Sequence, residues 1–156
     1  MKVDKANIIY IFCISLIEWC CNQVPQIPFT LENPSRSWIW QLPPMKQVML
    51  KFGLVLLHMD MCTHGSKRKK RTGLLTNATK IFGCMETQCD GSHTHEPWGP
   101  IQDPITGKWS FATGQECEYP EVFCNRIAEC VANHLQTQPR EPPVPRKKRV
   151  SHPKTN

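Results

Sequence analysis

Long apolar runs are missing from this chain of 156 residues. The apolar stretch nearest the start, Ile8 to Ile17, is too short to cross a bilayer, which takes about 20 apolar residues. The sequence therefore predicts no membrane partner. No internal repeat is evident either, so the chain is not an array of repeated units.

The opening, MKVDKANIIYIFCISLIEWCC, lacks the pair of small residues that marks a secretory cleavage site. Asp4 interrupts the basic start, and Glu18 and Trp19 close the apolar stretch. We therefore expect a buried amphipathic helix from about Lys5 to Asn22 and an intracellular protein with reduced thiols. The alternative is a secretory signal on a small secreted cysteine-containing protein, and only then would the sequon Asn77-Ala78-Thr79 matter.

The composition is that of one globular domain with a polar tail. Hydrophobic residues make up 40% and charged residues 21%, which disfavours disorder throughout the chain. Five of the fourteen prolines lie between residues 139 and 153. We therefore expect a folded domain at 1–138 and a basic, proline-rich, disordered tail at 139–156.

The net charge of +6 is concentrated in two runs that hold nine of the nineteen Lys and Arg residues. The first is the basic segment Lys67, Arg68, Lys69, Lys70 and Arg71, which predicts contacts with DNA phosphates, as does the tail. The second, Arg146 to Arg149, resembles a monopartite nuclear import signal and predicts a nuclear location. The alternative for each run is a solvated surface without a partner.

Apolar periodicity predicts alternating helices and strands, which favours an α/β layered sheet. After the first helix, the expected elements are a strand at Ile27–Leu31, a short helix with Trp38 and Trp40 capped by Ser35, a helix at Met45–Phe52, strands at Leu54–Met61 and Thr72–Asn77, an irregular loop at 83–106 with a turn at Pro104–Gly107, and a helix from Pro120 to about Leu135. The last helix should bury Phe123, Ile127, Val131 and Leu135.

An ordered set of short motifs resembles a known family. Glu32-Asn33-Pro34 is followed by a strand closing in DMCTHG (Asp60 to Gly65), then by KRT (Lys70 to Thr72) and TGLLTN (Thr72 to Asn77). This order resembles the C-terminal half of the catalytic domain of C5-cytosine DNA methyltransferases, in their divergent phage and mobile-element form. The resemblance implies a partial Rossmann-like sheet, of the class I methyltransferase type, with flanking helices.

The resemblance also implies roles for particular residues. Glu32 would be the acid that shares a proton with the cytosine ring, and Asn33 would fix the loop around it. Lys70 and Thr72 would hold the loop at the sheet edge or contact phosphate. The alternative is that Glu-Asn-Pro is only a turn between a strand and a helix, since Asn and Pro are common turn residues.

Two elements of the family are missing. No Gly-rich loop follows a first strand, so this chain is not expected to bind S-adenosylmethionine, although the complete family domain would. No Pro-Cys pair precedes Glu32, and without a nucleophile the chemistry cannot run. The sequence thus predicts a truncated or degenerate methyltransferase-like domain that is inactive alone and lacks its N-terminal half.

A cysteine- and histidine-rich loop at 83–106 predicts zinc. In GCMETQCDGSHTHEPWG, the residues Cys84, Cys89, His93 and His95 supply the thiolates and imidazoles that tetrahedral Zn²⁺ prefers. The spacing has no paired C-x-x-C knuckles, so an exposed polar loop is the alternative. Upstream, His58, Asp60, Cys62 and His64 alternate along a predicted strand, and Cys62 or His64 could join the ligands. A small zinc-stabilised nucleic-acid-binding protein is therefore the second functional hypothesis.

Overall fold

The computed structural model describes residues 2–111, 114 and 118–137, and the expected tail with Arg146 to Arg149 lies outside them. In chain order the elements are α1 (Lys2–Asn22), β1 (Thr30–Pro34), η1 (Trp38–Gln41), α2 (Pro43–Phe52), β2 (Val55–Asp60), η2 (Met61–His64), β3 (Arg71–Thr76), α3 (Thr79–Phe82), η3 (Gly83–Met85), β4 (Pro100–Gln102), β5 (Trp109–Phe111) and α5 (Glu121–Thr137). The mixture of helix and strand that the sequence predicts is confirmed.

Three strands form one sheet in the order β1-β3-β2. Both pairs are antiparallel, with Leu75 of β3 opposite Leu31 of β1 and Leu56 of β2. The three strands predicted from the sequence therefore lie in one sheet, in which β2 and β3 pair antiparallel. The described strands contain no parallel pair, so a Rossmann-like character is not shown.

β1 lies three residues later than predicted, and Glu32-Asn33-Pro34 belongs to the strand itself. Pro34 is tolerated there because β1 is an edge strand, where a missing N–H breaks no ladder. The pairing continues one residue beyond the strand, since the Ser35 N–H donates to the Arg71 carbonyl at 3.1 Å. Ser35 is therefore not the cap of η1, whose N-cap is Ser37.

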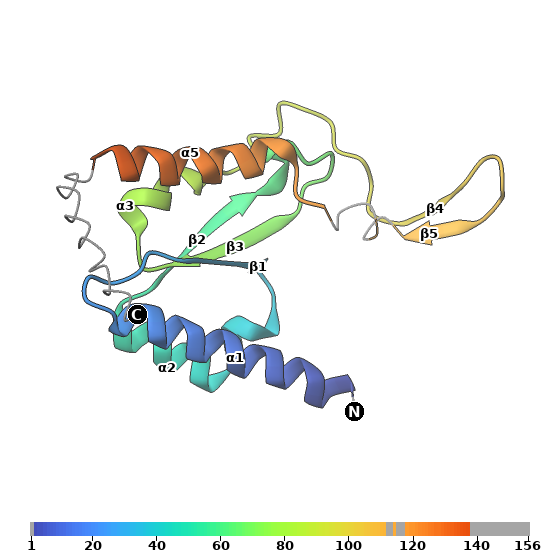
Figure 1. Cartoon of the computed structure of the whole chain (residues 1–156). Helices are drawn as coiled ribbons and strands as arrows, with labels where there is room; N and C mark the ends of the chain where they lie inside the picture. The colour runs from blue at the N-terminus through green and yellow to red at the C-terminus, as the bar shows by residue number, and fades with distance from the viewer. Residues whose placement is uncertain (1, 112–113, 115–117, 138–156) are drawn as a thin grey trace, which may run out of the picture.

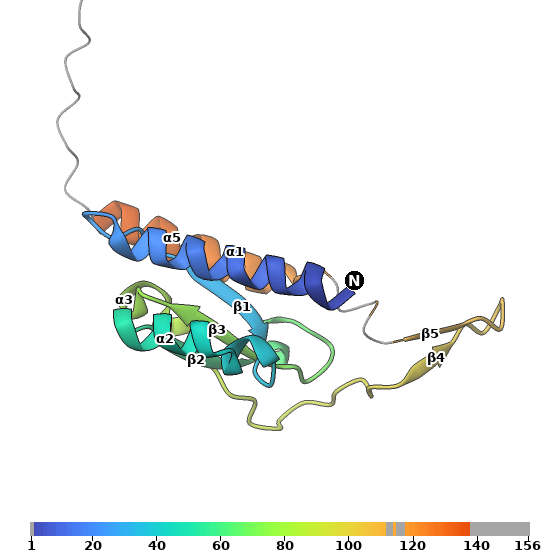
Figure 2. The ribbon, with the colours of Figure 1, turned by 90° about the horizontal axis from the view of Figure 1, so that it is seen from below.

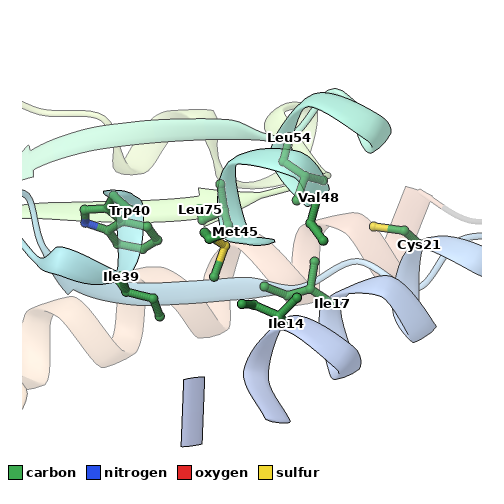
Figure 3. Packing of buried hydrophobic residues seen from close by; sticks show 9 residues of the cluster. All are labelled: Ile14, Ile17, Cys21, Ile39, Trp40, Met45, Val48, Leu54 and Leu75. Carbon is green, nitrogen blue, oxygen red and sulfur yellow. The ribbon is translucent and has the colours of Figure 1, made fainter. Parts of the chain in front are cut away.

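Helices cover both faces of the sheet (Figure 1). α1 and α2 lie on one face, where Ile14, Ile17, Met45 and Leu75 belong to one buried cluster (Figure 3). α3 and α5 lie on the other face (Figure 1), over a cluster that includes Leu74. Leu74 and Leu75 are neighbours on the central strand and point to opposite faces, so the strand is buried on both sides.

Two predicted helical faces differ from the structure. In α5 the buried residues are Phe123 and Cys130, whereas Val131 and Leu135 are exposed, because the helix meets α3 and η3 along the Phe123–Cys130 line. The first helix is not amphipathic, since Ile8, Ile11 and Phe12 face outward while other apolar residues are buried: Ile14, Ile17, Cys20 and Cys21. Among the described helices, none has the length and apolar character needed to cross a bilayer.

The β4–β5 hairpin projects away from the sheet in both views (Figures 1 and 2). Its turn is built by Asp103, whose carboxylate accepts the backbone N–H groups of Ile105 and Thr106 at 2.8 Å, and by Gly107 at φ +67°. The turn predicted at Pro104–Gly107 is thus confirmed. The hairpin lies beyond the loop that carries the candidate ligands, outside the packed core.

Candidate metal centre and basic segment

The end of β2 brings two distant parts of the chain together. β2 ends at Asp60, and η2 then turns the chain until Gly65 reverses it at φ +97°. The segment after η3 returns beside this end, where the Asp60 N–H donates to the Thr87 carbonyl at 2.9 Å. Asp60 Oδ2 in turn accepts the Cys89 N–H at 2.9 Å. These two bonds place Cys89 next to Cys62.

Four side chains converge there, and we call them the metal cluster: Cys62, Cys89, His93 and His95. Their ligand atoms all lie within 4.8 Å of one another. Cys89 Sγ lies 3.8 Å from His93 Nε2 and 3.5 Å from His95 Nε2. The Gly91 N–H points at the same sulfur from 3.4 Å, and the φ of +79° at Gly91 allows this tight loop.

Two thiols and two imidazoles are a donor set that fits a metal ion. Bonds of about 2.0 to 2.3 Å would hold such ligand atoms within roughly 4 Å of one another, so the cluster needs only a small closure. Burial raises the pKa of the Cys62 thiol, and the neighbouring Cys89 thiol raises it further. A cation between the sulfurs would reverse this effect by stabilising the thiolates. The cluster can therefore hold a metal ion.

One of the four predicted ligands is corrected. Cys89, His93 and His95 meet as expected, but Cys84 is held in η3 with its sulfur 3.0 Å from Cys130 Sγ of α5. Its place is taken by Cys62, which the alternating pattern of polar residues had suggested as a further ligand. The spacing within the loop could not reveal this exchange, because the choice depends on which side of the loop faces β2.

The other members of that alternating pattern do not share a face. His58 Nδ1 lies 3.2 Å from Ser35 Oγ, beside the edge of the sheet. His64 is fully buried, with Nδ1 3.1 Å from Arg126 of α5 and Nε2 2.8 Å from Thr87 Oγ1. Burial, with Arg126 nearby, lowers the pKa of His64. The 3-10 turn at η2 breaks the strand periodicity and separates Cys62 from His64.

The basic segment alternates between outward and inward side chains. Lys67, Lys69 and Arg71 leave 78%, 50% and 46% of their side chains exposed. Arg68 and Lys70, between them, leave only 3% and 25% exposed. This period of two is typical of extended chain, and it divides the five cations into a solvent-facing row and a structural pair.

Carboxylates offset part of this charge. Glu96 lies 2.7 Å from Arg68 and 3.7 Å from Lys67, and Glu32 lies 3.9 Å from Lys70. Asp60 is approached by both Lys69 and Arg71. Among the described residues, the segment thus has five cations against three carboxylates, which leaves a local excess of two positive charges.

The loop that carries Cys89, His93 and His95 is also hydrogen-bonded to the basic segment. Immediately after His95, the Glu96 N–H donates to the Lys67 carbonyl at 3.0 Å. The Arg68 Nε–H donates to the Pro97 carbonyl at 3.1 Å, and the Trp98 indole N–H donates to the Lys69 carbonyl at 3.2 Å. The backbone of the basic segment is therefore laid along the residues that follow the last ligand.

Asp60 also connects the metal cluster with the basic segment. It is fully buried, and its Oδ2 accepts the N–H of Cys89 while lying 3.4 Å from Arg71 and 3.9 Å from Lys69. Its other oxygen, Oδ1, has no hydrogen-bond partner among the described residues. One carboxylate thus connects a ligand of the metal cluster with two cations of the basic segment.

The residues expected from the family resemblance lie along β1. Glu32 Oε2 accepts the Tyr119 hydroxyl at 2.6 Å, whereas its buried Oε1 accepts no hydrogen bond from the part of the chain that the structure describes. Burial raises the pKa of Tyr119 far above its ordinary value, and the Glu32 carboxylate raises it further. Asn33 is paired with Gly73 inside the sheet rather than lying in a loop.

No protein-family model, curated protein or solved structure matches this chain. Its function is therefore inferred from the metal cluster and the basic segment themselves.

Proposed function

We propose that this protein is a small zinc-stabilised domain that binds nucleic acid, and that the metal holds the basic segment in its binding form. One observation carries the proposal: the residues that follow His95 bond directly to the backbone and side chains of the basic segment. Binding of His93 and His95 to an ion would fix the start of the segment 96–98, which bonds to the basic segment. Without the ion, the segment 96–98 is no longer held at His95, and the cations bonded to it lose this support.

Zinc fits the cluster better than other common metals. Thiolate and imidazole donors in equal number suit a tetrahedral ion, while calcium and magnesium prefer oxygen ligands. All four ligands are protein side chains, which is typical of a structural site and not of a catalytic one with an open position. An intracellular location, in the nucleus or elsewhere, would keep Cys62 and Cys89 reduced and ready to bind.

The outward row Lys67, Lys69 and Arg71 supports a polyanionic partner. Its side chains are exposed to solvent and can meet phosphates, and the local excess of positive charge adds to a net charge of +6 for the whole chain. Such contacts read backbone charge and carry no base information. Binding should therefore be indifferent to sequence and weaken steeply with salt, because each phosphate contact releases counterions.

Fluorescence anisotropy with a labelled DNA duplex tests the proposal. Lys67→Gln/Lys69→Gln should weaken binding and reduce the slope of log K against log salt by about 1.8, since each contact contributes about 0.9. The matched control is Lys46→Gln/Lys80→Gln, which removes the same charge from exposed positions on α2 and α3.

Removing the metal with a chelator should weaken binding in the wild-type protein, and restoring zinc should recover it. Equal loss in the two double variants would mean that only net charge matters. Full binding by the metal-free protein would separate the basic segment from the metal and overturn the proposal.

A degenerate methyltransferase-like domain is the second proposal, and one arrangement favours it. The sheet register sets Pro34 opposite Thr72, and Lys70 lies 3.9 Å from the buried Oε1 of Glu32, so the two family-like motifs are neighbours. Because the chain has neither a Gly-rich loop nor a Pro-Cys pair, it should transfer no methyl group from tritiated S-adenosylmethionine to DNA and bind none by calorimetry. Labelled DNA would show that the nucleophile lies elsewhere, and the search would begin with Cys13, Cys20 and Cys21.

A further inference from the structure

A second pair of cysteines lies apart from the metal cluster. Cys84 of η3 and Cys130 of α5 are 46 residues apart in sequence, yet their sulfur atoms are 3.0 Å apart. Both are free thiols, and neither belongs to the metal cluster. Two sulfurs in contact on different elements need only a small movement to bond.

The pair can be reached from solvent. Both sulfur-bearing residues line a cavity of about 480 Å³, together with Lys80 and His134. Cys84 is exposed, whereas Cys130 is buried. Burial raises the pKa of Cys130 to about 12, and the hydrogen bond with Cys84 contributes to this rise. Cys84 is therefore the sulfur that a reagent in the cavity meets first, and Cys130 is the one behind it.

We propose that Cys84 and Cys130 are a site of reversible oxidation, which small disulfides such as oxidised glutathione convert into an intramolecular disulfide. The Cys84 thiol loses its proton and attacks one glutathione sulfur, which forms a mixed disulfide and releases one glutathione thiolate. Cys130 then loses its proton and attacks the Cys84 sulfur, which releases the second glutathione. The two cysteines supply two electrons, and one oxidised glutathione becomes two reduced molecules.

The bond would join α5 covalently to η3, close to η2, the turn that carries Cys62 of the metal cluster. α5 also carries Arg126, whose guanidinium donates to the Thr63 carbonyl at 2.9 Å and lies 3.1 Å from His64 Nδ1. Thr63 is the residue after the ligand Cys62. The disulfide would thus fix the position of α5, which contacts η2 through Arg126, and it would use none of the four residues of the metal cluster. This inference does not depend on the proposed nucleic-acid function.

Peptide mapping of the zinc-loaded protein, after incubation with oxidised glutathione, tests the proposal. Trypsin places Cys130 alone in the peptide 127–140, Cys84 with Cys89 in 81–108, and Cys124 with Cys117 in 109–126. The expected product without reductant is peptide 81–108 joined to 127–140, two mass units below the sum of the free peptides. Fragmentation should place the bond at Cys84 and not at Cys89, and dithiothreitol should break it.

Cys84→Ser should abolish the cross-link, and this exposed position should tolerate the change without loss of folding. Cys124→Ser changes a thiol on the same helix as Cys130 for which the described residues show no sulfur contact, and it should leave the cross-link unchanged. A glutathione adduct that stays on Cys84, a bond from Cys124 or Cys89, or no oxidation at all would each overturn the proposal.

Discussion

Replacing Asp60 by Asn tests the junction between the metal cluster and the basic segment. The amide oxygen can still accept the Cys89 N–H, and the amide nitrogen takes the place of Oδ1, for which the described residues offer no hydrogen-bond partner. The change therefore removes mainly the negative charge that faces Lys69 and Arg71. It leaves the shape of this buried position nearly unchanged.

The expected loss follows from the surroundings of Asp60. Breaking a buried ion pair costs about 3 to 5 kcal/mol, and a hydrogen bond to a charged group contributes about 1.5 to 3 kcal/mol. Both cations are about half exposed, so water compensates them once the carboxylate is gone. We therefore expect Asp60→Asn to lower the free energy of unfolding by about 2 to 3 kcal/mol.

Urea denaturation of the zinc-loaded protein measures this loss. With a slope of about 2 kcal/mol per molar urea, the midpoint should fall by about 1 to 1.5 M. The control is Asp103→Asn, because that carboxylate also accepts backbone N–H groups but lies fully exposed in the β4–β5 turn. A midpoint for Asp60→Asn equal to that of the wild type would refute the role given to this carboxylate.

Two further predictions concern Tyr119 and the glycines. The raised pKa of Tyr119 means that the unfolded chain gives up this proton first, so stability should fall as the pH rises above about 10, the ordinary value for tyrosine. In a Tyr10→Phe background, absorbance titration of the phenolate should show that Glu32→Gln lowers the pKa of Tyr119, and an unchanged titration would contradict the contact. Gly65→Ala should cost more stability in urea than Gly53→Ala, at about 2 to 4 against about 1 to 2 kcal/mol. Both glycines have positive φ, but only at Gly65 would the new Cβ meet Val122, at 3.2 Å, so equal losses would contradict the packing of α5.

The strands and helices of the core could be predicted because their signals are local. TGLLTN and LVLLHMDM are apolar and β-branched enough to be identified as strands, and Gly53 ends α2 in the left-handed conformation. The position of β1 could not be predicted, since its limits are set by pairing with β3, some forty residues later. The exposed face of α1 could not be predicted, because apolar residues lie on all sides of this helix. Their periodicity therefore does not indicate which side is buried.

The metal cluster shows the same limit at the level of single side chains. Cys89, His93 and His95 lie within one loop, so their grouping is visible in the sequence. Cys62 joins them only because the chain after η3 returns beside Asp60, and this contact spans 27 residues. The internal pairing of the basic segment was equally hidden, because Glu96 and Asp60 reach it from separate parts of the chain.

X-ray absorption at the zinc edge tests most directly the claim that Cys62 completes the metal cluster. The wild-type protein should show two sulfur neighbours at about 2.3 Å and two nitrogen neighbours at about 2.0 to 2.1 Å. Cys62→Ser should lose one sulfur from this shell, and Cys84→Ser should retain both. The opposite pattern, in which Cys84→Ser loses a sulfur and Cys62→Ser keeps two, would contradict the structure and return the site to the four ligands of the loop.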